Sequence, residues 1–114
     1  MADRTERVRN IKAVLFEEAG AWSAQCLDFD IAAQAETLLD VRDELARVLA
    51  VHVAASAQMG REPFPGIAPA PLRFWDLYES GLPVESRSVS YRLDNGPKLP
   101  PITPDLRVAR SLAV

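Results

Sequence analysis

The sequence has very little cysteine and histidine, with one of each, Cys26 and His52, in 114 residues. One cysteine cannot form a disulfide within the chain, and one cysteine with one histidine is too few for the common zinc sites. No apolar run approaches the roughly 20 residues that a membrane span requires. Residues 1–7 are polar and of mixed charge, which is unlike a secretory signal. We therefore expect a cytoplasmic protein without a disulfide, a membrane anchor or a cofactor.

Proline is absent from residues 1–62, and all nine prolines lie at Pro63 or beyond. Because proline interrupts both helices and central strands, only the first part can form long uninterrupted elements. The length suits a single domain. The sequence predicts a core over residues 1–60 and a proline-rich extension over residues 61–114. We expect that extension to pack on the same domain or on a second subunit.

Three short strands are predicted in the first part of the chain, over residues 11–16, 21–27 and 31–35. Trp22, Ala24 and Cys26 alternate with polar residues, which is typical of a strand with one buried face. A turn ending at Gly20 joins the first two strands into an antiparallel hairpin, since glycine readily adopts a positive φ. Asp28-Phe29-Asp30 forms a polar corner before the third strand.

The next segment carries the clearest helical signal, from Thr37 to about Met59. The Thr37 hydroxyl and the Asp40 side chain have the spacing of a reciprocal capping box. Gly60 is a natural C-terminal cap. Apolar positions recur at steps of three and four, which predicts one buried stripe. It consists of Leu38, Val41, Leu45, Val48 and His52, widened by Leu49 and Val53.

The extension predicts a short helix over about residues 72–80 and a strand over about residues 85–93. Val89 and Tyr91 lie on one face of that strand. The tail beyond it is rich in proline and is expected to be extended. The predicted fold class is α+β. It comprises a three-stranded antiparallel sheet with one long packed helix, a short second helix and a fourth, C-terminal strand.

Acidic residues are concentrated in one block. Residues 17–44 contain eight acids and one base, Arg42, whereas the segments on either side each carry a net charge of +2. Phosphates of nucleic acid would be repelled by this block, and a basic protein would be attracted. A solvated surface with no partner explains the same charge equally well. Asp28, Asp30 and Glu36 are the candidate partner-binding residues.

Several short motifs, in this order, resemble the HicB-like family over about residues 11–58. They are a strand, a turn at Gly20, the strand Trp22-x-Ala24-x-Cys26, the acidic corner Asp28-Phe29-Asp30, the strand end Gln34-Ala35, and Thr37-Leu38 opening a helix. The resemblance implies a sheet-and-helix fold like a truncated ribonuclease H and the role of an antitoxin in a toxin–antitoxin pair. The family pattern has glycine where this chain has Ala35. Residues 60–114 contain neither of the DNA-binding motifs that such antitoxins commonly carry, so DNA binding is not expected.

Catalysis is the less favoured interpretation. Asp28 and Asp30, with Glu17 and Glu18, would be the metal-binding carboxylates of a vestigial ribonuclease H-like nuclease. The side chains of an acidic corner more often accept hydrogen bonds from nearby backbone N–H groups. His52 is expected at the edge of the core. Cys26 is expected to be a small core residue rather than a reactive thiol.

We therefore expect a non-catalytic protein-binding module that resembles a HicB-type antitoxin and holds a small basic ribonuclease toxin. An orphan homo-oligomer with a structural or small-ligand role remains the alternative. Residues 11–16 have two apolar faces, and the second face requires cover by aromatic residues or by a second subunit. A homodimer is predicted on this ground. The candidate residues for dimer or sheet-face packing are Phe74, Trp75, Tyr78, Val89 and Tyr91.

Overall fold

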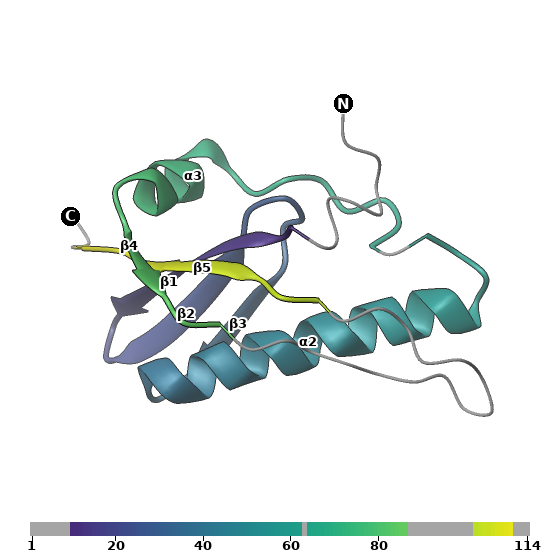
Figure 1. Ribbon diagram of the computed structural model, residues 1–114, viewed down its shortest axis with the longest axis horizontal. Coiled ribbons are helices and arrows are strands. Elements are labelled where there is room, and N and C mark those ends of the chain that lie inside the picture. The colour runs from purple at the N-terminus through teal and green to yellow at the C-terminus, as the bar shows by residue number, and fades with distance from the viewer. Residues whose placement is uncertain (1–9, 63, 87–101, 111–114) are drawn as a thin grey trace.

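The computed structural model describes residues 10–62, 64–86 and 102–110, and over these residues the fold is α+β, as predicted. A mixed five-stranded sheet, in the order β3-β2-β1-β5-β4, has helix α2 on one face and helix α3 on the other (Figure 1). The elements are β1 Lys12–Glu18, β2 Ala21–Cys26, β3 Ala32–Ala35, α2 Leu38–Gln58, α3 Leu72–Glu79, β4 Leu82–Val84 and β5 Asp105–Val108. Neither of these helices is both long enough and apolar enough to cross a membrane.

The three predicted strands form an antiparallel meander, but within a mixed five-stranded sheet rather than as the predicted three-stranded sheet. Strand β1 pairs with β2, and β2 pairs with β3. Two residues join β1 to β2, and both have a positive φ: 53° at Ala19 and 81° at Gly20. This is the geometry of a type I′ hairpin turn, whose twist matches that of the flanking strands. The positive φ of Gly20 agrees with the turn predicted there. Ala19 also has a positive φ, which is unfavourable for a residue with a Cβ.

The C-terminal part of the sheet differs from the prediction. Strand β5 lies between β1 and β4, parallel to β1 and antiparallel to β4, so the expected extended tail supplies a central strand. The predicted strand over residues 85–93 is not found where it can be assessed, since Glu85 and Ser86 lie outside any strand. Residues 87–93 lie outside the described residues. A four-residue parallel strand carries too short a pattern to be recognised before its partner is known.

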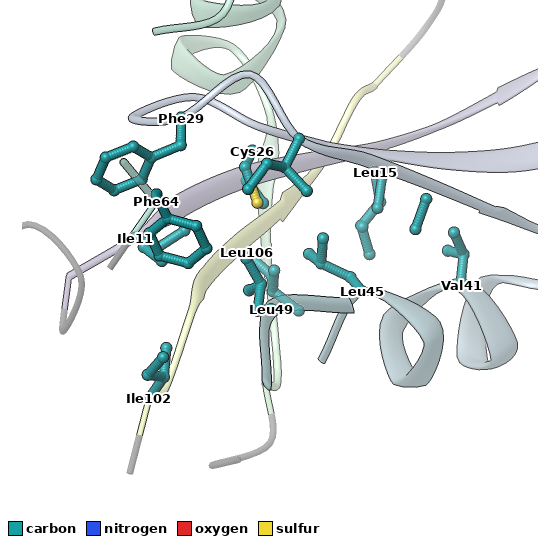
Figure 2. Close-up of a cluster of buried hydrophobic side chains, with 14 of the residues drawn as sticks. Ile11, Leu15, Cys26, Phe29, Val41, Leu45, Leu49, Phe64, Ile102 and Leu106 are labelled. Atoms are coloured by element: carbon teal, nitrogen blue, oxygen red, sulfur yellow. The ribbon is translucent and has the colours of Figure 1, made fainter. Parts of the chain in front are cut away.

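The main core lies between the sheet and α2 (Figure 2). The helix buries a stripe at steps of four and three, formed by Val41, Leu45, Leu49, Val53 and Ser56. The buried face of the helix is therefore rotated about the helix axis relative to the predicted one. Leu38, Val48 and His52, which were predicted to be in the stripe, are only half-buried. The Thr37 hydroxyl accepts the Asp40 N–H at 3.1 Å, which confirms the N-cap.

The second face of the sheet is covered within the same chain. Val14, Phe16 and Leu27 form a smaller cluster with Ala70 and Tyr78, and partly buried residues of α3 pack against it. The Phe16 and Phe74 rings stack with their centroids 5.8 Å apart. The sequence left open whether the aromatic residues or a second subunit would cover this face, and the aromatic residues of α3 do so. The need for cover over β1 therefore no longer argues for a dimer.

Candidate functional site

The acidic residues of the central block lie at opposite ends of the three-stranded meander. Glu18 pairs with Ala21 at the hairpin end of the sheet. Trp22 pairs with Ala35, so Glu36 follows β3 at that same end. Asp28 and Asp30 lie in the corner between β2 and β3, at the other end. The structure thus brings Glu36 toward Glu18 and separates it from the two aspartates with which it was grouped.

The aspartates of the corner take part in the local fold. Asp28 Oδ1 accepts the backbone N–H of Lys12 at 2.8 Å. Asp30 Oδ1 accepts from the Gln25 side-chain amide at 2.8 Å, and the Asp30 N–H donates to the carbonyl of Ala68 at 2.7 Å. The two carboxylates thus fix the corner to β1 and β2, and the Asp30 backbone fixes it to the segment that leads to α3. Asp30 nevertheless stays exposed, and the other exposed acids of the meander, Glu17, Glu18 and Glu36, lie at the hairpin end.

Further acids follow at the start of α2, which lies at the hairpin end of the sheet (Figure 1). Asp40 is in the first turn. Asp43 and Glu44 follow, with bases beside them: Arg42 Nε lies 3.4 Å from Asp43, and Arg47 pairs with Glu44. Those two ion pairs offset the charge on the helix. Glu17, Glu18 and Glu36 on the sheet side are all exposed, and none of them forms an ion pair with another described residue.

A shallow groove of about 480 Å³ lies on the α3 side of the sheet, over β2 and β3. Polar side chains contribute to its floor: the Gln34 amide donates to the Ser23 hydroxyl at 3.4 Å, and the Gln25 amide donates to the carbonyl of Cys26 at 3.0 Å. Phe16 and Glu18 also line it. The groove therefore begins beside the aromatic contact with α3 and reaches the acidic hairpin end.

Strand β3 forms an open edge beside this groove. The N–H of Cys26 donates to the carbonyl of Ile31 at 2.9 Å. Hydrogen-bonded pairs alternate along an antiparallel ladder, so Ala33 directs its backbone groups toward β2, whereas Ala32 and Gln34 direct theirs outward. Among the described strands, none pairs with β3 on its outer side. The outward groups of these two residues are available to an added strand.

The aromatic residues of α3 lie away from this edge and fix the helix to the sheet. Tyr78 is buried, and its hydroxyl donates to Asp105 on β5 at 2.6 Å. The Trp75 indole N–H donates to the carbonyl of Ala70 at 3.3 Å. The other two candidates for such packing, Val89 and Tyr91, lie outside the described residues.

Candidate catalytic groups do not converge. Cys26 is fully buried, and its pKa is raised by burial and by the nearby charge of Asp28, so the thiol is held neutral. His52 is half-buried with its ring 5.9 Å from that of Phe64. Within residues 10–62, 64–86 and 102–110, no three side chains of the histidine, cysteine, aspartate or glutamate types gather as a metal site would require. Asp28 and Asp30 are engaged with β1 and β2 instead.

Comparison with known proteins adds no assignment. No family model, no curated protein and no solved structure matches this chain. The HicB-like resemblance therefore stays a prediction. The part of the site that sequence reasoning missed is the groove with its polar residues Ser23, Gln25 and Gln34. Their alternation along two strands indicated a polar outer face, but which part of that face α3 covers depends on contacts that are distant in the sequence.

Proposed function

We propose that this protein is a non-catalytic protein-binding module that holds a small basic protein, in the manner of a HicB-type antitoxin. The observation that carries the proposal is the exposed acidic end of the meander, formed by Glu17, Glu18 and Glu36. Within the part of the chain that the structure describes, these carboxylates form no ion pair, unlike Asp43 and Glu44 of α2. Uncompensated charge of this kind raises the rate at which an oppositely charged protein associates.

The order of the first elements agrees with what the resemblance implies. Three antiparallel strands lead into one long helix that packs on the sheet. On this reading the partner is a small basic ribonuclease toxin, and the acidic end competes with RNA phosphates for the basic surface of the toxin. The protein itself then needs no metal and no nucleophile. The proposed site of action is the cytoplasm, where such a toxin meets its RNA.

The proposal is tested by coexpression with the products of small basic open reading frames that neighbour the gene. The expected result is that one of them arrests growth and degrades RNA when expressed alone and is silent when this protein is present. The purified pair should form a complex that weakens as salt rises, because exposed charges are screened beyond about 8 Å at physiological ionic strength. If no neighbouring product binds or is inhibited, the antitoxin role is wrong.

A further inference from the structure

The outer edge of β3 carries neither the charged residues nor the proline that often keep a strand edge from pairing. The strand is Ala32-Ala33-Gln34-Ala35, which contains no charged residue and no proline. Ala32 and Gln34 are exposed, and their backbone groups point outward. Edges in natural proteins are commonly protected by charge, by proline or by a covering segment. The edge is therefore open to an added strand.

Acidic residues lie beyond both ends of this edge. Asp30 precedes β3 and Glu36 follows it, and both are exposed. Five residues lie between them, so the two are six residue steps apart, which corresponds to about 20 Å of extended chain. Glu18 adds a third carboxylate in the groove beside the strand. Bases lie against the rings of α3: Arg73 is 4.7 Å from the ring of Phe74, Lys12 Nζ is 5.7 Å from that of Trp75, and Arg107 is 4.2 Å from that of Tyr78.

We propose that β3 binds an extended segment of the partner as a sixth strand, with basic side chains about six residues apart that reach Asp30 and Glu36. Backbone hydrogen bonds to Ala32 and Gln34 would supply affinity without regard to sequence, and the flanking acids would select a basic segment. Small or hydroxyl side chains between the two bases fit over the polar floor of the groove. This inference rests on the proposed protein-binding role and specifies how the partner would bind.

A second copy of the chain is the other candidate for this edge, and its charge argues against it. Pairing of β3 with β3 of a second copy would bring Asp30 and Glu36 of one chain beside the same acids of the other. Like charges that face each other across a strand pair are destabilising. A basic segment turns the same positions into attractive pairs. The edge is thus better suited to a partner of opposite charge than to self-association.

The test uses the whole protein and a synthetic seven-residue peptide, arginine-valine-threonine-valine-threonine-valine-arginine, capped at both ends. Titration followed by amide chemical shifts should perturb the backbone of Ala32 and Gln34 and the groove residue Ser23. Ala32→Pro removes an outward N–H and leaves the ladder to β2 intact, so peptide binding should weaken about tenfold or more. Ala32→Val is the matched control and should bind as the wild type does. Circular dichroism and unchanged shifts in β1 establish that each variant is folded.

Two changes to the peptide test the same contact without altering the protein. With the arginines beside Asp30 and Glu36 in an antiparallel alignment, the backbone amides of the two threonines face Gln34 and Ala32, so methylation of both amides should abolish binding. Replacement of both arginines by glutamate should also abolish binding if Asp30 and Glu36 select a basic segment. The inference is overturned if the wild-type protein does not bind the peptide, if the shifts fall outside β3 and its groove, or if the methylated peptide binds equally well. It is also overturned if sedimentation shows a wild-type dimer that Ala32→Pro converts to a monomer, because the edge would then be filled by a second copy.

The inference and the proposed function fail in distinguishable ways. A toxin that binds Ala32→Pro and the wild type equally well would overturn strand addition and leave the protein-binding role standing. Peptide binding that depends on Ala32, without any toxin that the protein inhibits, would support strand addition and overturn the antitoxin role.

Discussion

At the scale of single residues, the acidic block contains Asp28, which holds the fold, Glu36, which faces solvent, and Asp30, which is hydrogen-bonded and exposed. Asp28 accepts the Lys12 N–H and Asp30 accepts from the Gln25 amide, whereas Glu36 follows the free end of β3. Sequence reasoning placed Asp28, Asp30 and Glu36 in one partner surface because only their charge was visible. The hydrogen bonds separate Asp28 from Glu36, and substitution experiments should separate them too.

Asp28→Ala should destabilise the protein by about 1–2 kcal/mol, because a half-buried backbone N–H loses a charged acceptor. Asp28→Asn keeps an oxygen at the same position and should cost less than about 1 kcal/mol. Glu36→Gln is the matched surface change and should stay within about 0.5 kcal/mol of the wild type. Urea denaturation measures all three. Equal stability of the two Asp28 variants would show that the contact with Lys12 contributes nothing.

Ala19 is a second residue with a testable role, because it adopts φ 53° in the hairpin turn next to Gly20. An L-residue with a Cβ is disfavoured there, and asparagine tolerates the region better than alanine does. Ala19→Asn should stabilise the fold by about 0.5–1 kcal/mol, whereas Ala19→Val should destabilise it by at least as much. The midpoint of urea unfolding measures both. A lower midpoint for Ala19→Asn would rule out the type I′ turn.

At the scale of elements, local patterns were sufficient for some parts of the fold and insufficient for others. The hairpin and α2 follow from alternation, from Gly20 and from the Thr37 cap, all of which act within a few residues. The placement of β5 between β1 and β4 depends on pairing with a strand about ninety positions earlier in the chain. No local periodicity encodes such a pairing, and for that reason the tail was expected to be extended. The rotation of the α2 stripe has the same origin, since Phe64 packs beside the second half of that helix.

Leu45→Ala should destabilise the protein by about 2–5 kcal/mol, because Leu45 is buried in the middle of the α2 stripe and its truncation leaves a cavity. Val51→Ala on the exposed face of the same helix is the control. It should change stability by less than about 0.5 kcal/mol. Chemical denaturation compares the two. A loss below half a kilocalorie for Leu45→Ala would place that face of the helix in solvent.

Helix α3 is held to β5 by Tyr78, whose pKa is raised to about 12 by burial and by the hydrogen bond to Asp105. A raised pKa favours the neutral form in the folded state. The stabilisation is therefore complete below the ordinary tyrosine pKa of about 10 and is lost as pH rises toward 12. Tyr78→Phe should cost about 1–3 kcal/mol at about pH 8. The difference from the wild type should shrink between pH 10 and 12 in pH-dependent denaturation. A difference that is constant over this range would contradict the assignment.

At the scale of the whole molecule, one face of the sheet is covered by α2, the other face is covered over β1 but grooved over β2 and β3, and the β3 edge is flanked by acids. Helix α2 covers one face, and α3 with the Ala68–Ala70 region covers β1 on the other (Figure 1). Apolar surface that needs a partner is thus less extensive than the sequence indicated. What remains exposed is the β3 edge, its polar groove and the carboxylates at the hairpin end. On the proposed role, this exposed charge favours a charged partner over a dimer formed through an uncovered apolar face.

The most direct test of the proposed role is a comparative capture from lysate of the cells that produce this protein. The wild type is compared with the double variant Glu18→Gln, Glu36→Gln and with a control of equal charge change on the α2 surface, Asp43→Asn, Glu44→Gln. The proposal predicts one small basic protein that is retained by the wild type and by the control, released by salt and not retained by the double variant. Retention of the same proteins by all three would contradict the claim that the acidic end of the meander binds a basic partner.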